Sequence, residues 1–146
     1  MQKTCEGHWP VAKRVLRYLK GTQDFGIKYT QVDDFILIGY SDSDFDGDKE
    51  ISISTSGYAM SLGSGAVSWR SRKQSIPTDS TTKVEYVAAV EATKEIVWLK
   101  KILEDLQVKQ VQSTPLMIDN TLAIKLAKNP KFHDRTKHIN TKYHLI

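Results

Sequence analysis

Phe35-Ile-Leu-Ile-Gly-Tyr-Ser-Asp42 is a short apolar run that closes on a carboxylate, and the predicted sheet is organised around it. Runs of β-branched and aromatic residues of this length favour β-strands. We therefore predict a strand over residues 35–40, central in its sheet, that ends at Asp42. A second β-rich run at residues 25–29 precedes it across a short polar segment, which predicts a paired strand or hairpin.

Three further β-type runs extend the predicted sheet. Strands are expected over residues 57–62 and 66–69, and the Gly63-Ser-Gly65 turn between them makes them antiparallel neighbours. Residues 115–118 form a short apolar strand that ends at Asp119, and a helix follows at once. This order places Asp119 at the carboxyl end of a strand, where open α/β sheets position their functional sites.

Apolar residues at helical spacing predict four helices, over residues 8–20, 80–106, 121–128 and 137–146. The first is basic and amphipathic, and the longest has Asp79 or Ser80 as candidate caps. One face of the longest helix carries a carboxylate followed by alanines and larger apolar residues: Glu85, Ala88, Ala89, Ala92, Ile96, Leu99 and Leu103. Such a face is expected to lie against a sheet, so we predict a mixed α/β fold.

The composition is that of one ordinary globular domain, with 146 residues, 40% hydrophobic and 26% charged. Cys5 is the single cysteine, which excludes an intramolecular disulfide and any metal site built on several thiolates. No apolar run approaches the length of a membrane span, and the first residues lack the apolar region of a signal peptide. We therefore expect an intracellular protein, in the cytoplasm or the nucleus.

The net charge of +4 hides a segregation of charge along the chain. Seven acids stand against one lysine between residues 33 and 50, whereas six Lys/Arg and three histidines stand against one aspartate between 125 and 146. An acidic centre with basic flanks suits a metal site that handles a polyanion, since the metal needs carboxylates and the phosphates need Lys/Arg. Solvated helix faces would give the same pattern, and charge alone leaves both interpretations open.

Three carboxylates stand at comparable places in the predicted fold: Asp42 and Asp119 follow strands, and Glu85 heads the inward face of the long helix. Carboxylate oxygens are the ligands that Mg²⁺ prefers, and converging carboxylates repel one another until a cation neutralises them. Two such ions about 4 Å apart activate a water and stabilise the leaving oxygen in phosphodiester cleavage. The alternative is that Asp42 and Asp119 cap turns and that Glu85 is an exposed helix residue.

Seven strings, in order along nearly the whole chain, resemble the ribonuclease H segment of copia-type retrotransposon Pol polyproteins. They are Arg17-Tyr-Leu-Lys-Gly-Thr22, Gly39-Tyr-Ser-Asp-Ser-Asp44, Ser54-Thr-Ser-Gly-Tyr58, Val67-Ser-Trp69 with Arg72-Lys-Gln74, Val84-Glu-Tyr-Val-Ala88, Ile118-Asp-Asn120 and Asn129-Pro-Lys-Phe-His-Asp-Arg-Thr-Lys-His-Ile139. Each string alone is weak evidence, but seven in series are specific. Residues 1–22 resemble the connection segment on the polymerase side, and residues 23–146 resemble the ribonuclease H domain.

The resemblance implies a ribonuclease H-like fold, with three antiparallel strands, one parallel strand and flanking helices. It also implies hydrolysis of the RNA strand of RNA–DNA hybrids with two Mg²⁺ ions, or Mn²⁺, as part of a reverse transcriptase. Asp42, Glu85 and Asp119 match three of the family's four metal-binding acids. By the same resemblance, Asp42 would bridge both ions, Glu85 would bind one beside the ribose 2′-hydroxyl, and Asp119 would complete the shell of the other.

The chain departs from the family's pattern at its end and at two internal positions. The family continues beyond Ile146 into a further strand and helix with the fourth acid, so a last strand, a last helix and one metal ligand are expected to be missing. Lys83 and Phe45 stand where the family usually has Glu and Trp. An exposed strand edge at residues 116–118 then predicts either a homodimer or a monomer of weak activity.

Basic residues away from the acids are candidate phosphate contacts, with solvated side chains as the alternative: Arg14, Arg17, Lys137, Lys142 and the loop residue His133. Trp69 and Trp98 are predicted to lie in the core rather than to stack on bases. Two hypotheses stay open. One is a ribonuclease H-type enzyme, and the other is a catalytically weak or inactive retroelement-derived module that binds nucleic acid or another protein.

Overall fold

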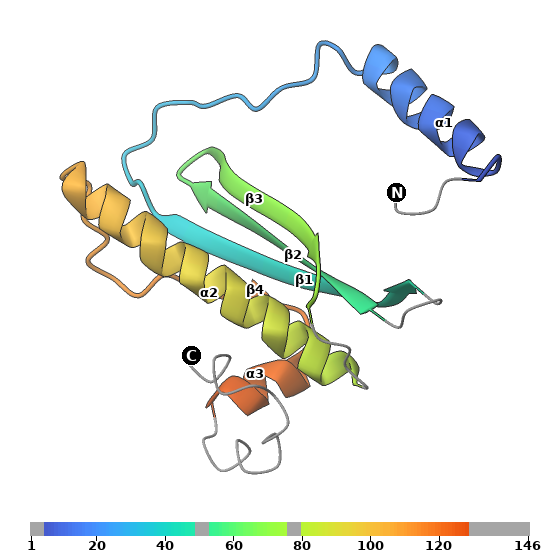
Figure 1. Ribbon diagram of the computed structural model, residues 1–146. Coiled ribbons are helices and arrows are strands. Elements are labelled where there is room, and N and C mark those ends of the chain that lie inside the picture. The colour runs from blue at the N-terminus through green and yellow to red at the C-terminus, as the bar shows by residue number, and fades with distance from the viewer. Residues whose placement is uncertain (1–4, 49–52, 76–79, 129–146) are drawn as a thin grey trace.

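The computed structural model describes residues 5–48, 53–75 and 80–128 of the chain. Within them, four strands form one sheet in the order β3-β2-β1-β4 (Figure 1). The strands are β1 (Leu37–Asp48), β2 (Ile53–Leu62), β3 (Gly65–Lys73) and β4 (Leu116–Ile118). β2 pairs antiparallel with both β1 and β3, whereas β4 pairs parallel with β1. The predicted mixed sheet of ribonuclease H-like type, with β1 in a central position, is confirmed.

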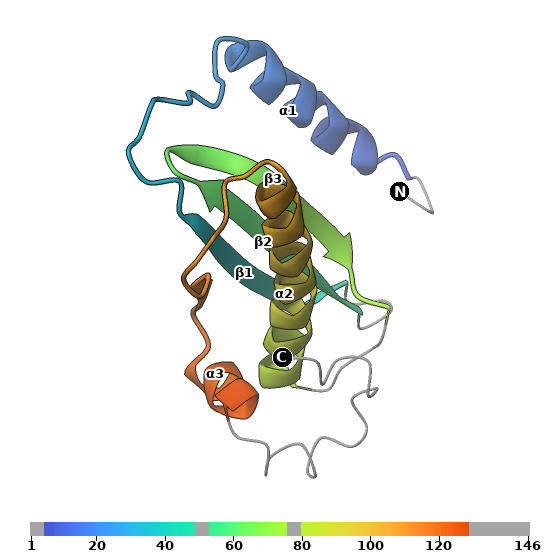
Figure 2. The ribbon, with the colours of Figure 1, turned by 90° about the vertical axis from the view of Figure 1, so that its left-hand side faces the viewer.

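Three helices accompany the sheet: α1 (His8–Gly21), α2 (Thr81–Asp105) and α3 (Thr121–Lys128). α2 runs across one face of the sheet, and α3 lies beside the first turns of α2 (Figures 1 and 2). The Oδ1 atom of Asn120 accepts hydrogen bonds from the backbone N–H groups of Leu122 and Ala123, at 2.9 and 3.0 Å. This cap starts α3 immediately after Asp119.

α2 approaches the sheet closely at Gly39, which pairs with Met60 on one side and with Leu116 on the other. A Cβ atom at Gly39 would lie 2.8 Å from Cδ1 of Ile96, a residue of α2, and 3.0 Å from Cδ1 of Leu116. The absent side chain therefore admits Ile96 to a core cluster that also contains Leu37, Met60, Ala92 and Leu103. The predicted apolar face of α2 is confirmed, because its members Glu85, Ala88, Ala89, Ala92, Ile96 and Leu103 are buried.

The central strand is longer than predicted: β1 starts at Leu37 and continues to Asp48, so the prediction that it ends at Asp42 is wrong. Asp42 pairs with Gly57, and Asp44 pairs with Thr55. The polar second half of β1 stays extended because the hydrogen bonds between strands join backbone N–H and C=O groups. Every residue of this stretch carries these groups, whatever its side chain.

The predicted strand at residues 25–29 does not form. The hydroxyl of Tyr29 donates to the carbonyl of Ala66. The backbone N–H of Thr30 donates to Oγ of Ser64, which in turn donates to the carbonyl of Thr30, at 2.9 and 3.0 Å. Residues 25–30 are thus held against the β2–β3 hairpin by hydrogen bonds that involve side chains. These bonds do not continue the backbone pairing of the sheet.

The two tryptophans predicted in the core are exposed, Trp69 by 65% and Trp98 by 55%, so that prediction is wrong. On β3, Ser68 faces α2, since its hydroxyl donates to Oε1 of Glu95 at 2.6 Å. Side chains alternate along a strand, so Trp69 points to the opposite face of the sheet. There it completes a row of register partners across the four strands, which we call the open row: Met117, Tyr40, Ala59 and Trp69.

α1 confirms the predicted first helix, but it has no buried residue and stands apart from the sheet (Figures 1 and 2). Ser80 is the N-cap residue of α2, although its side chain makes no capping hydrogen bond. The other candidate cap, Asp79, and the helix predicted over 137–146 lie outside the described residues. Among the described helices, none combines the length and the apolar character that crossing a bilayer requires.

The close packing at Gly39 predicts the effect of adding one methyl group there. Gly39→Ala is expected to lower the free energy of unfolding by about 1 to 3 kcal/mol, because the methyl group overpacks the contact with Ile96. Gly57→Ala is the matched control, since its Cβ would meet the nearest atom at 3.7 Å, an ordinary contact. Urea denaturation of both variants measures the difference, and equal stabilities would contradict this account of α2 packing.

Candidate metal centre

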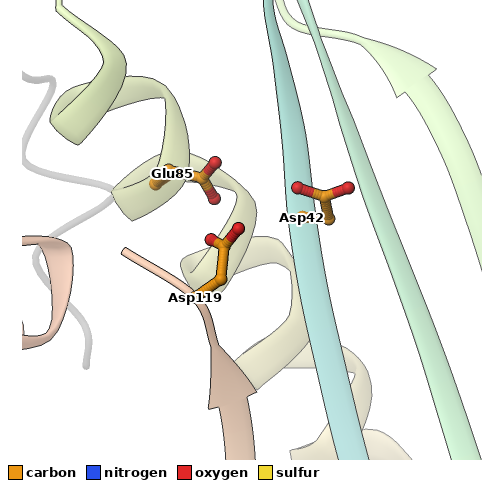
Figure 3. A group of neighbouring side chains, drawn as sticks. All are labelled: Asp42, Glu85 and Asp119. Atoms are coloured by element: carbon orange, nitrogen blue, oxygen red, sulfur yellow. The ribbon is translucent and has the colours of Figure 1, made fainter. Parts of the chain in front are cut away.

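Three carboxylates from distant parts of the sequence meet at one place (Figure 3). Asp42 comes from β1, Glu85 from the start of α2, and Asp119 from the residue after β4. One ligand oxygen from each residue lies within 4.8 Å of the other two. The three acids that the sequence singled out are therefore brought together; Glu85 and Asp119 stand at the predicted places, whereas Asp42 lies within β1 and not at its end.

The spacing of the three oxygens suits a divalent cation. Oxygens on opposite sides of an Mg²⁺ ion, each at about 2.1 Å, stand about 4.2 Å apart, and a larger ion such as Ca²⁺ spaces them more widely. Three oxygens that are 4.8 Å apart lie about 2.8 Å from their common centre, so each would move by about 0.7 Å to reach an Mg²⁺ ion at that point. The cluster could hold a metal ion without rearrangement of its strands or helix.

Glu85 is the most enclosed of the three acids, with 8% of its surface exposed. Burial raises the pKa of its carboxyl group above the ordinary value of 4.5, and the nearby charges of Asp119 and Asp42 raise this pKa further. Its Oε2 atom is buried without a hydrogen-bond partner among the described residues. Buried polar atoms usually have a partner, so a cation would satisfy an atom that the described chain leaves unsatisfied.

Ser43 is a site residue that the sequence analysis missed. Its hydroxyl and its backbone N–H hydrogen-bond to the carboxylate of Glu85, and both bonds lower the pKa of Glu85 against the larger effect of burial. The same N–H lies 2.8 Å from Oδ1 of Asp42. Ser43 therefore orients two of the three acids, and its position beside Asp42 in the sequence was the only signal.

A hollow of about 660 Å³ lies on the face of the sheet opposite α2 and reaches the acid cluster. Asp42 and Asp119 line one part of it, and Tyr40, Trp69 and Met117 of the open row line another. The surface beside the carboxylates is thus mainly apolar and aromatic.

The predicted phosphate contacts are not gathered at the acids within the described residues. Arg14 and Arg17 are exposed on α1, which stands apart from the sheet (Figure 1). Lys137, Lys142 and His133 lie outside the described residues.

Fold and site together define a mixed α/β domain of ribonuclease H-like architecture with a three-carboxylate centre. The chain belongs to the family of copia-type retrotransposon Pol polyproteins. It is 42% identical over 139 residues to the retrovirus-related Pol polyprotein from transposon TNT 1-94 of Nicotiana tabacum, which covers 95% of this chain and 10% of that protein. It is 38% identical over 146 residues, its full length, to the corresponding polyprotein from transposon RE2 of Arabidopsis thaliana, again 10% of that protein.

The chain therefore spans about a tenth of the length of these Pol relatives. A shorter relative is the secreted RxLR effector protein 161 of Plasmopara viticola, which is 52% identical over 95 residues. That match covers 65% of this chain and 67% of the effector. No protein-family model and no solved structure matches the chain.

The enclosed position of Glu85 predicts how stability depends on pH. Glu85→Gln is expected to raise the melting temperature near neutral pH, because the folded state then no longer holds a buried carboxylate beside two others. The pKa of Glu85 is raised on folding. The destabilisation of the folded state by its buried charge is therefore absent below pH 4.5, and it is complete once the pH exceeds the raised pKa. The gain should therefore vanish in acid.

Thermal melts in EDTA, from about pH 4 to about pH 8, measure this difference. Glu91→Gln, on the same helix outside the cluster, is the matched control. A gain of the same size and pH dependence in both variants would show that the effect does not come from the cluster.

Proposed function

We propose that this chain is a ribonuclease H-type endonuclease segment of a retrotransposon reverse transcriptase, which hydrolyses the RNA strand of RNA–DNA hybrids. The observation that carries the proposal is the convergence of Asp42, Glu85 and Asp119 within 4.8 Å of one another. Membership of the Pol family and the ribonuclease H-like sheet support it.

The three acids would hold two Mg²⁺ ions, or Mn²⁺, with Asp42 shared between them, Glu85 on one and Asp119 on the other. When bound, these ions activate a water and stabilise the leaving oxygen of the phosphodiester. The chain's own contribution is to hold the three carboxylates in place, with Ser43 donating to Glu85 and lying beside Asp42. Glu85 would also lie near the ribose 2′-hydroxyl, the group by which a protein distinguishes RNA from DNA.

The hybrid would be bound mainly through its phosphates. Arg14 and Arg17 of α1 are exposed cations suited to this role, and we extend the proposal to Lys137, Lys142 and His133. Such contacts release counterions, so binding should weaken steeply with salt, and one phosphate contact removed should lower the salt slope by about one unit.

Cleavage of a labelled RNA–DNA hybrid in Mg²⁺ or Mn²⁺ tests the proposed activity. Asp42→Asn is expected to reduce cleavage to background, because the amide has no negative charge and only one ligand oxygen, which does not suffice for a residue shared by two cations. Hybrid binding by this variant, measured by fluorescence anisotropy, should stay close to that of the unchanged chain.

Asp44→Asn is the matched control for this experiment, since Asp44 lies on the same strand but outside the cluster. It should cleave like the unchanged chain. Tight hybrid binding with no cleavage by the unchanged chain in either metal would reject the enzyme and favour a nucleic-acid-binding module.

The second candidate function is a catalytically weak or inactive retroelement-derived module that binds nucleic acid or another protein. The open row favours it, because Trp69, Met117 and Tyr40 are 65%, 50% and 47% exposed. Contiguous exposed apolar surface of this kind is typical of interaction sites.

A homodimer is the partner that we propose for the edge of the sheet. β4 has only three residues and, within the described part of the chain, pairs on one side only, with β1. Light scattering after size exclusion should give twice the 16.6 kDa mass of the chain. Met117→Lys should shift the mass to that of a monomer, whereas Val97→Lys, at an equally exposed position on α2, should not. A monomeric unchanged chain would reject the dimer.

A further inference from the structure

Gln74 joins three elements at the end of β3. It is a polar residue with only 7% of its surface exposed. Its backbone N–H donates to the carbonyl of Ser54 on β2, at 2.8 Å. Its side-chain Nε2 donates to Oγ of Ser56, also on β2, at 2.7 Å, and to the carbonyl of Val84 on α2, at 3.0 Å. One buried amide thus ties β2 to the first turn of α2.

Both residues that accept hydrogen bonds from the Gln74 side chain are neighbours of residues in or beside the acid cluster. Val84 immediately precedes Glu85 in α2. Ser56 pairs in register with Ser43, which hydrogen-bonds to Glu85 and lies 2.8 Å from Asp42. Gln74 therefore constrains Glu85 along the helix backbone, and it constrains the Ser43 side of the cluster through the β1–β2 ladder.

We propose that Gln74 is a positioning residue of the acid cluster, which sets Glu85 against Asp42 so that these two carboxylates can bind the same cation. This proposal rests on the proposed function. Gln74 touches no carboxylate itself, so it acts through Val84 and Ser56. Groups that hydrogen-bond directly to a metal ligand typically change metal affinity by about 10- to 100-fold when they are removed, and Gln74 lies one contact further out, so we expect the lower end of this range.

Gln74→Met tests the proposal, because methionine has nearly the same length and lacks both N–H donors. Isothermal titration of the unchanged chain and the variant with Mn²⁺ measures metal affinity directly. The dissociation constant is expected to rise about tenfold in the variant. The Mn²⁺ concentration that gives half-maximal cleavage should rise equally, whereas the rate at saturating Mn²⁺ and the KM for the hybrid should stay close to those of the unchanged chain.

Leu103→Ala is the matched control for a general loss of stability. Leu103 is buried in the same helix but belongs to the core cluster with Leu37 and Met60, away from the first turn of α2. It should lower the melting temperature and leave the Mn²⁺ affinity unchanged. Ser56→Ala removes one of the two acceptors of Gln74 and keeps the other, so it should weaken Mn²⁺ binding by a smaller factor even if Gln74→Met fails to fold.

Three outcomes separate the possibilities. Weaker Mn²⁺ binding in Gln74→Met and Ser56→Ala, with no change in Leu103→Ala, supports the proposal. Unchanged Mn²⁺ affinity in Ser56→Ala and in folded Gln74→Met overturns it and leaves the proposed function standing. No Mn²⁺ binding by the unchanged chain overturns the proposed function and this proposal with it, because there is then no cation site to position.

Discussion

The close packing of α2 on β1 at Gly39 is the contact on which the rest of the fold depends. A glycine between Met60 and Leu116 lets Ile96 approach the sheet, and this approach sets the path of a 25-residue helix. Glu85 lies eleven residues before Ile96, or about 16 Å along the helix. A rigid element of this length transmits the packing at Gly39 to the acid cluster, so a core contact without any polar group determines where Glu85 stands.

The acid cluster lowers the stability of the fold that contains it. Glu85 is buried beside two other carboxylates, and both burial and like charge raise its pKa. Such a group persists only where the surrounding elements over-determine its position. Here β1, β4 and α2 each contribute one acid and also pack against one another in the core, which makes separation of the carboxylates costly. A cation between the carboxylates would relieve this repulsion.

The acids could be predicted from the sequence because each one is marked by its local pattern. Glu85 heads an apolar helix face, and Asp119 stands between a short strand and a helix. Other features depend on partners that local patterns do not contain. β1 runs past Asp42 because β2 pairs with it as far as Asp48. Trp69 is exposed because the register of β3 turns Ser68 toward Glu95. Ser43 and Gln74 likewise meet the cluster only through strand register and tertiary contacts.

The two faces of the sheet differ in what they carry: one holds the residues that orient Glu85, and the other holds the open row. This difference matters for the two proposed functions, the enzyme and the binding module. Glu85 and the residues that orient it, Gln74 and Ser43, are tied to α2 and to the backbone of β1 and β2. The open row with Trp69 and Tyr40 lies on the opposite face, exposed and outside these contacts. Substitutions there change the surface offered to a partner without touching the hydrogen bonds that hold the acids. Loss of one acid, conversely, relieves repulsion and leaves the apolar face intact. The two surfaces nevertheless adjoin, because Asp42 and Asp119 line the same hollow as Tyr40, Trp69 and Met117. A substitution in the open row therefore changes the surroundings of these two carboxylates, while the hydrogen bonds that orient Glu85 stay in place.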